Sequence, residues 1–222
     1  MTRHPRAAAG RGAATVLVLS VLAVGVAWQM AGESTQVVSP AAAAALPPEL
    51  LRQVQAGPGV AVAGNPAGSV TVVEFFDYRC PYCRLMLPRL EALAASDKRV
   101  RLVFKDWPVF GGISVNAARI ALAAGWQGKY LDAHKALFAL PRFMDEASLR
   151  SAMSGAGIDL ARLDHDLNTR GAEIDVSLAR TDSEARAIGF QGTPGLVIGT
   201  MVMPGALSEG DLRKLVNQAA AR

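Results

Sequence analysis

The chain has 222 residues, with 23 basic and 19 acidic side chains and a formal net charge of +4. Three of the basic residues, Arg3, Arg6 and Arg11, lie in an N-terminal segment without acids, so the rest of the chain is close to neutral. No basic run interleaved with aromatic residues occurs, which argues against nucleic-acid binding. The chain after this segment is long enough for one domain with its own core.

An uncharged, largely apolar segment follows the three arginines at residues 12–32. As a helix it spans about 30 Å, which is enough to cross a bilayer. Small residues at Gly25, Ala27 and Ala31 also permit cleavage by a signal peptidase. Residues 1–32 are therefore predicted to be a signal peptide or a membrane anchor. In both cases the arginines stay inside and the remainder is exported to a compartment where disulfides persist.

A linker is predicted at residues 33–58, because this stretch is rich in Ser and Ala, lacks strong periodicity and contains Pro47-Pro48. A short helix is expected near its end, at residues 49–55. Turn-forming Gly and Pro residues then enclose a short strand at 60–62 and precede a longer strand at 69–76. We therefore expect the folded domain to comprise residues 59–222.

Cys80 and Cys83 follow the longer strand directly, in the sequence Cys-Pro-Tyr-Cys, and the chain has no other cysteine. A disulfide that closes so short a loop removes little entropy from the unfolded chain, so its value is chemical rather than structural. Pro81 suits the first position of a helix, which makes Cys80 the N-cap residue. The helix N-terminus stabilises a thiolate there. We predict that Cys80 is an exposed nucleophile of low pKa and that Cys83 is the buried resolving thiol.

Three other interpretations of the two cysteines remain open. A structural zinc site needs four ligands, but besides the cysteines the chain offers only His4, His134 and His165 among the usual nitrogen and sulfur ligands. The cysteines can also be small buried apolar residues or an inert covalent link. We predict no metal site.

The remaining pattern is a strand, a long helical block and a final group of two strands and a helix. A helix is predicted at residues 81–95 and a strand at 99–104, whose residues alternate in polarity. The final helix is predicted to begin at Ser208, an N-cap residue. Apolar residues at helical spacing indicate a block at about 114–189, with helices at 117–124, 130–140, 146–153, 160–167 and 172–188, and strands follow at 196–198 and 200–202.

The residues from Glu74 to Cys83, the helical block and Gly192-Thr193-Pro194 together resemble the DsbA-like thiol-disulfide oxidoreductases. The resemblance covers about residues 59–222. Glutaredoxins also carry Cys-Pro-Tyr-Cys, but are expected to be shorter and to lack the helical block. The resemblance implies an α/β thioredoxin-like fold, in which a central mixed sheet is interrupted by an inserted helical subdomain at about 114–189.

The resemblance also identifies Thr193-Pro194 as the family's cis-proline loop, beside the dithiol. The backbone of Thr193 is then expected to pair with an extended client segment, as an added strand. We predict that Pro81 and Tyr82, between the cysteines, contact the client as well. An ordinary turn at residues 192–195 is the alternative.

Glu74 lies six residues before Cys80 in an otherwise apolar strand and resembles the buried acid of this family. Burial raises the pKa of such a carboxyl, and Glu74 is then able to accept a proton from Cys83 during resolution of a mixed disulfide. The alternative is a structural ion pair with Lys105. His134 is expected to be a packing residue on a helix and is not placed in the site.

The sequence therefore predicts an exported protein disulfide oxidoreductase that donates the Cys80–Cys83 disulfide to client proteins with cysteines. A membrane redox partner is expected to reoxidise it, and no cofactor is expected. Tyr82 replaces the histidine that strongly oxidising relatives carry, which leaves a reductase or isomerase as the alternative, together with a chaperone-like binding module whose dithiol is incidental. Isomerases of related fold usually carry an extra dimerisation region, and residues 33–58 are too few for a folded one, which argues against an isomerase. We expect a monomer. The predicted location is the periplasm, either soluble after cleavage or tethered by residues 12–32.

Overall fold

The computed structural model describes residues 46–56 and 61–222. The predicted signal peptide or anchor, and most of the predicted linker, lie outside these residues. Within the described ranges, no helix is both long enough and apolar enough to cross a membrane.

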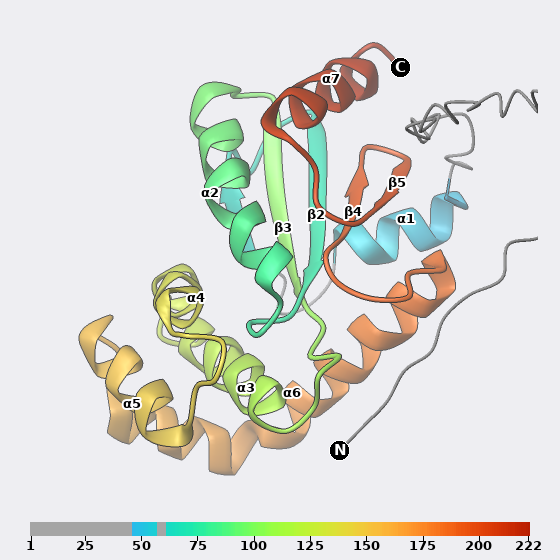
Figure 1. Cartoon of the computed structure of the whole chain (residues 1–222). Coiled ribbons are helices and arrows are strands. Elements are labelled where there is room, and N and C mark those ends of the chain that lie inside the picture. Colours follow the sequence, from blue (N-terminus) through green and yellow to red (C-terminus); the bar gives the residue numbers. More distant parts are fainter. Residues whose placement is uncertain (1–45, 57–60) are drawn as a thin grey trace, which may run out of the picture. The chain divides into compact units, whose positions relative to one another are not determined.

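The centre of the fold is a mixed sheet of five strands in the order β1-β3-β2-β4-β5 (Figure 1). Strands β2 and β3 are parallel and the other neighbours are antiparallel. The central strand β2 is rich in Val and Phe because both faces of the sheet are covered. This arrangement confirms the predicted α/β fold with a mixed sheet. The strands are β1 (Ala61–Gly64), β2 (Val70–Phe76), β3 (Val100–Asp106), β4 (Gly195–Ile198) and β5 (Met201–Pro204).

Alternate residues of the strands contribute to two separate cores, one on each face of the sheet. Val72 and Phe76 face the core that includes α2 (Pro81–Ser96) and α7 (Glu209–Ala220). Val73 and Phe75 face the other core, which includes α1 (Pro48–Gln55) and the C-terminal part of α6 (Leu160–Ile188). Because successive side chains of a strand point to opposite faces of the sheet, a residue's position along β2 decides which of the two cores it joins.

Helix α1 belongs to this second core, although the sequence predicts the start of the domain at residue 59. Its Val54 is fully buried, and Leu50 and Leu51 pack beside it. The apolar residues of α1 lie on one side of the helix, so the short helix is stable only against the sheet. The folded unit therefore begins before the predicted boundary.

The helical block between β3 and β4 comprises α3 (Ile113–Gly125), α4 (Tyr130–Ala139), α5 (Glu146–Gly155) and α6. This confirms the predicted helical insertion. The prediction of separate helices at 160–167 and 172–188 was wrong, because α6 continues through Gly171. Gly171 is buried within the continuous helix, and a Cβ atom there would meet only the flexible end of the Arg119 side chain on α3, at 2.6 Å.

Candidate dithiol active site

Cys80 is the N-cap residue of α2, as predicted. Its Sγ accepts a hydrogen bond from the backbone N–H of Cys83 at 3.4 Å, and its own N–H donates to the carbonyl of Asp77 at 3.0 Å. Pro81 occupies the first helical position, where a backbone N–H has no partner within the helix. The turn between β2 and α2 thus places the Cys80 sulfur among the free N–H groups of the helix end.

Hydrogen bonds lower the pKa of Cys80 from 9.0 to about 6. The largest contribution is the hydrogen bond with the Cys83 side chain, and Thr193 and the backbone N–H groups of Cys83 and Tyr82 add to it, while burial opposes the shift. Cys83 is fully buried, and burial, followed by its hydrogen bond with Cys80 and the charge of Glu74, raises its pKa well above 9.0. The two thiols therefore have opposite properties: one ionises readily and the other stays protonated.

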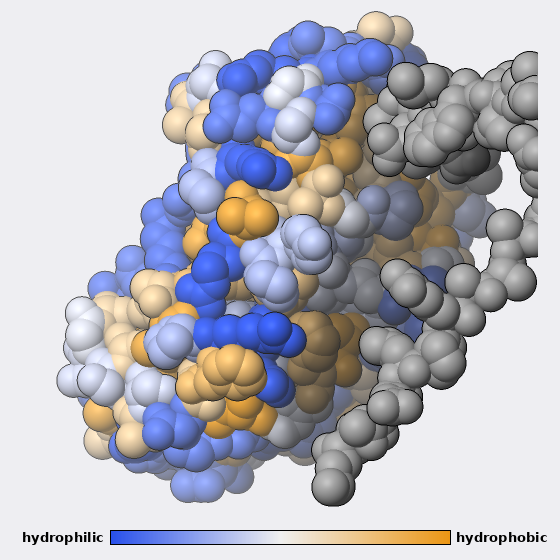
Figure 2. Space-filling model, viewed as in Figure 1, coloured by the Kyte–Doolittle hydropathy of each residue, from blue (hydrophilic) through white to orange (hydrophobic). Residues whose placement is uncertain are grey.

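The prediction that Cys80 is exposed was wrong, because only 2% of the residue is accessible to solvent. The carbonyl of Thr193 lies over the thiol and accepts its hydrogen bond at 3.3 Å. Tyr82 and Leu85, in the first turns of α2, are 60% and 50% exposed. Figure 2 shows apolar residues lying between hydrophilic ones over α2 and the inserted helices. The sulfur therefore lies beneath a partly apolar surface rather than on it.

The loop that carries Thr193 contains the predicted cis peptide bond, between Thr193 and Pro194. The hydrogen bond between Cys80 and the Thr193 carbonyl places this loop beside the dithiol, so both parts of that expectation are confirmed. Pairing of Thr193 with a client backbone stays a prediction.

Glu74 is 1% exposed, and neither of its carboxylate oxygens has a hydrogen-bond partner among the described residues. Burial first, and the nearby charge of Cys80 second, raise its pKa well above 4.5. The alternative prediction, an ion pair between Glu74 and Lys105, was wrong. In the parallel register Glu74 is opposite Phe104, whereas Lys105 is opposite Phe75 on the other face of the sheet.

Lys105 instead forms a buried ion pair with Glu184 of α6, at 2.8 Å. His134 is also buried, as expected of a packing residue. Its Nδ1 lies 3.1 Å from the hydroxyl of Tyr78, and burial lowers its pKa to about 3, so the ring is neutral. His134 thus forms part of the core behind the dithiol.

Asp77 is a site residue that the sequence analysis left without a role. Its Oδ1 accepts hydrogen bonds from the backbone N–H of Arg79 and the hydroxyl of Ser114, both at 2.8 Å. Its Oδ2 accepts from the backbone N–H of Phe110 at 3.1 Å. The carboxylate therefore joins the turn before Cys80 to the loop between β3 and α3. The sequence signal for such a turn is an Asp at the end of a strand, because its carboxylate can accept a hydrogen bond from the backbone N–H two residues later, here that of Arg79.

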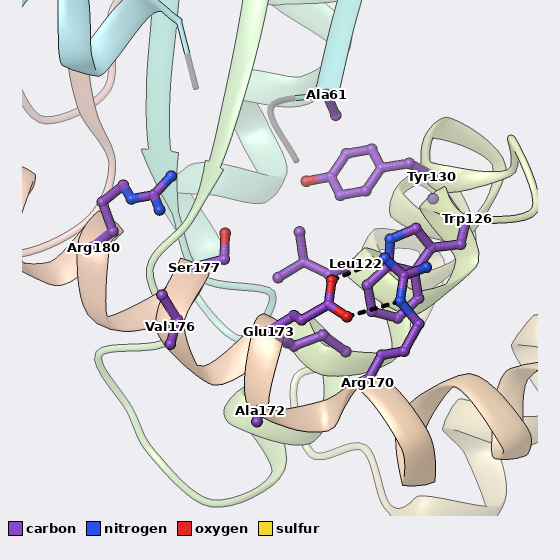
Figure 3. A pocket seen from close by; sticks show the side chains of 12 residues that line it. Ala61, Leu122, Trp126, Tyr130, Arg170, Ala172, Glu173, Val176, Ser177 and Arg180 are labelled. Atoms are coloured by element: carbon purple, nitrogen blue, oxygen red, sulfur yellow. Dashed lines mark hydrogen bonds and ion pairs between the residues drawn. The ribbon is translucent and has the colours of Figure 1, made fainter. Parts of the chain in front are cut away.

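Two cavities lie outside the dithiol. One of about 720 Å³ lies between α3, α4 and α6, where Arg170 faces Glu173 and stacks on Trp126 (Figure 3). The other, of about 660 Å³, is lined by residues after β3 and at the end of α6, including Trp107, Phe190 and Gln191. No predicted site residue lines either cavity.

Within the described ranges, no group of three or more His, Cys, Asp or Glu side chains is placed to hold a metal ion.

Alkylation of the reduced protein with iodoacetamide is expected to begin at Cys80. The rate should rise through a pH of about 6, because the thiolate is the reactive species, and should already be near its plateau at the pH where an ordinary thiol starts to ionise. Peptide mapping over a pH series identifies the modified sulfur. Prior reaction at Cys83, or a Cys80 that ionises near 9, would contradict the assignment.

Comparison with known proteins gives consistent matches for this geometry. Residues 71–217 match the model of the DSBA-like thioredoxin domain. A thioredoxin-like oxidoreductase from Silicibacter pomeroyi is 37% identical with a TM-score of 0.73, and the match covers 77% of this chain and 98% of that one. The thiol-disulfide exchange protein alpha-DsbA2 of Wolbachia pipientis is 27% identical with a TM-score of 0.72, over 77% and 91% of the two chains.

Longer proteins also contain a similar segment. A Na⁺/H⁺ antiporter NhaA 1 from Salinispora arenicola is 32% identical over 136 residues, which is 60% of this chain and 20% of that protein. The chain spans less than a third of the length of the curated relatives that it matches.

Proposed function

This chain belongs to the DSBA-like thioredoxin domain family and is a protein disulfide oxidoreductase, and we propose from this that it donates disulfides to exported client proteins. The observation that carries the proposal is the difference between the two thiols. The Cys80 thiolate is stabilised, with its pKa lowered to about 6. Stabilisation of the reduced form makes the disulfide a stronger oxidant. Strongly oxidising relatives carry a histidine at the position of Tyr82 that stabilises the thiolate. In this chain the hydrogen bonds around Cys80 supply part of that stabilisation.

In the proposed reaction, Cys80 and Cys83 start as a disulfide. A client thiolate attacks the Sγ of Cys80, the bond between the two cysteines breaks, and Cys83 leaves and takes a proton from Glu74. A second client thiolate then attacks the client sulfur of the mixed disulfide, and Cys80 leaves as a thiolate. The client loses two electrons and gains a disulfide, while the protein is left with two reduced cysteines.

Glu74 fits this role because it is buried without a partner of its own among the described residues, and its charge acts on the pKa of Cys83 as that of Cys80 acts on the pKa of Glu74. In the reverse direction it accepts the proton of Cys83 when that thiol attacks a mixed disulfide on Cys80. Pro81, Tyr82, Thr193 and Pro194 are proposed to contact the client. Cys80 is proposed as the nucleophile and Cys83 as the resolving thiol.

We further propose export of the chain after residue 32 and reoxidation by a membrane partner, with the domain acting as a monomer. The uncharged segment at 12–32 supports export, either as a cleaved signal or as a tether. The antiporters that share a similar segment are consistent with a position near a membrane.

Equilibration of the dithiol with glutathione buffers tests the donor role. We expect a reduction potential above about −230 mV, more oxidising than thioredoxin at about −270 mV, because the Cys80 thiolate is stabilised. Reduced and oxidised fractions are measured by acid quenching and thiol labelling. A potential near or below that of thioredoxin would instead favour the reductase, and no exchange at all would favour the binding module.

A further inference from the structure

The arginines of the described residues differ in how they are paired. Eight of them form ion pairs with a carboxylate, and four others donate to carbonyl or hydroxyl oxygens. The side chains of Arg79, Arg142 and Arg180 do neither within the described ranges, and Arg79 is the one next to Cys80. The paired arginines are Arg52, Arg99, Arg119, Arg150, Arg162, Arg170, Arg186 and Arg213.

The backbone of Arg79 is fixed, while the hydrogen-bonding capacity of its side chain is unused. Its N–H donates to the Asp77 carboxylate, which also binds Ser114 and Phe110 and makes no hydrogen bond with the guanidinium. The Nε of Arg79 is buried without a partner among the described residues. The guanidinium carbon lies 5.8 Å from the centre of the Phe110 ring, and Phe110 is 47% exposed. Arg79 and Phe110 thus present a planar cation beside an exposed apolar ring.

The acidic residues in and just after β2 and at the end of β3 are buried, and none of them pairs with the Arg79 side chain within the described ranges. Glu74, Asp77 and Asp106 are all at most 4% exposed. Asp77 is committed to its three hydrogen bonds, and Asp106 accepts one from Tyr130 at 2.6 Å. The side chain of Arg79, one residue before Cys80 in the chain, therefore carries a positive charge without a carboxylate partner among the described residues.

We propose that Arg79 and Phe110 bind an acidic residue next to the client's reactive cysteine, so that the protein prefers acidic client segments. This proposal rests on the proposed exchange function. A guanidinium presents paired N–H donors that match a carboxylate, and the ring covers the methylene groups of a glutamate side chain. A lysine at the same client position meets a like charge. Charge complementarity of this kind acts mainly on the rate of encounter and on the choice of partner.

The test uses two peptides that each carry one cysteine as a mixed disulfide with thionitrobenzoate, one with glutamates and one with lysines beside the cysteine. A Cys83→Ser variant of the full chain provides Cys80 alone. Its thiolate attacks the peptide sulfur, the bond to thionitrobenzoate breaks, and the coloured thiolate released reports the rate. We expect the glutamate peptide to react about tenfold faster than the lysine peptide at low salt, and the ratio to fall as salt is added.

Arg79→Gln in the same background is expected to bring the ratio close to one, and Arg79→Lys to retain part of it. Arg150→Gln is the matched control, because it removes one positive charge on α5, where Arg150 pairs with Asp164. It should leave the ratio as it is. A ratio near one in the parent, a ratio unchanged by Arg79→Gln, or an equal loss in Arg150→Gln would overturn the proposal. Failure of every peptide to release thionitrobenzoate would instead reject the exchange function itself.

Discussion

Glu74→Gln is expected to slow the release of a client from a mixed disulfide on Cys80 by about a hundredfold, with little change in the formation of that mixed disulfide. Formation from the reduced protein needs only the Cys80 thiolate, which hydrogen bonds already stabilise. Release needs Cys83 to lose its proton, and burial makes that thiol a very weak acid. Glu74 is buried near enough for its charge to raise the pKa of Cys83, so it is placed to take that proton.

The two steps are separable with a peptide–thionitrobenzoate disulfide and the reduced protein. The coloured product reports formation, and mass spectrometry after acid quenching reports release of the peptide thiol. Cys83→Ser is the control in which the mixed disulfide accumulates without release. Equal slowing of both steps by Glu74→Gln would leave Glu74 without a role in proton transfer.

Glu74→Leu should slow release in the same way while making the fold more stable, by about 1–3 kcal/mol at neutral pH, since a buried carboxyl without a partner is removed. The folded pKa of Glu74 is raised, so the unfolded carboxyl ionises first as the pH rises above about 4.5, and the wild type loses stability until the folded carboxyl ionises too. The advantage of the variant should therefore grow with pH. A less stable variant would indicate a structural role for Glu74.

Lys105→Met is expected to lower the free energy of unfolding by about 3–5 kcal/mol, because it leaves the carboxylate of Glu184 buried without its partner. The pair joins β3 to α6, and the side chains are only 6% and 4% exposed. Helix α6 ends at Ile188, five residues before Thr193, so its attachment to the sheet also positions the loop over Cys80. Urea unfolding measures the change.

The double variant Lys105→Met, Glu184→Leu should recover most of that loss, because no unpaired charge then remains buried. Arg150→Met serves as the matched control. It breaks an exposed ion pair with Asp164 and should cost less than about 1 kcal/mol. A small effect of Lys105→Met would show that Glu184 tolerates the loss of its partner. No recovery in the double variant would show that the loss does not come from an unpaired buried charge.

The sequence by itself determined the local features of this protein. The apolar residues of β2, followed by Cys80 and Pro81, predicted a strand, a turn and a helix that begins at the first cysteine, and the structure has all three. Ser208 likewise marked the start of α7. These signals involve residues a few positions apart, so the chain specifies them without reference to the rest of the fold.

The tertiary structure decided the partners of the buried polar groups. Alternation along β2 and β3 is visible in the sequence, but the register that separates Glu74 from Lys105 is set by strand pairing, and Glu184 reaches Lys105 only because α6 returns across the sheet. The burial of Cys80 depends in the same way on Thr193, which is more than a hundred residues away in the chain. Two helices were predicted at 160–167 and 172–188, whereas α6 runs unbroken through Gly171, which is buried in the fold. Contacts between residues distant in sequence supply the free energy that overrides the secondary-structure preference of a single segment. The sequence of one segment therefore does not predict these contacts.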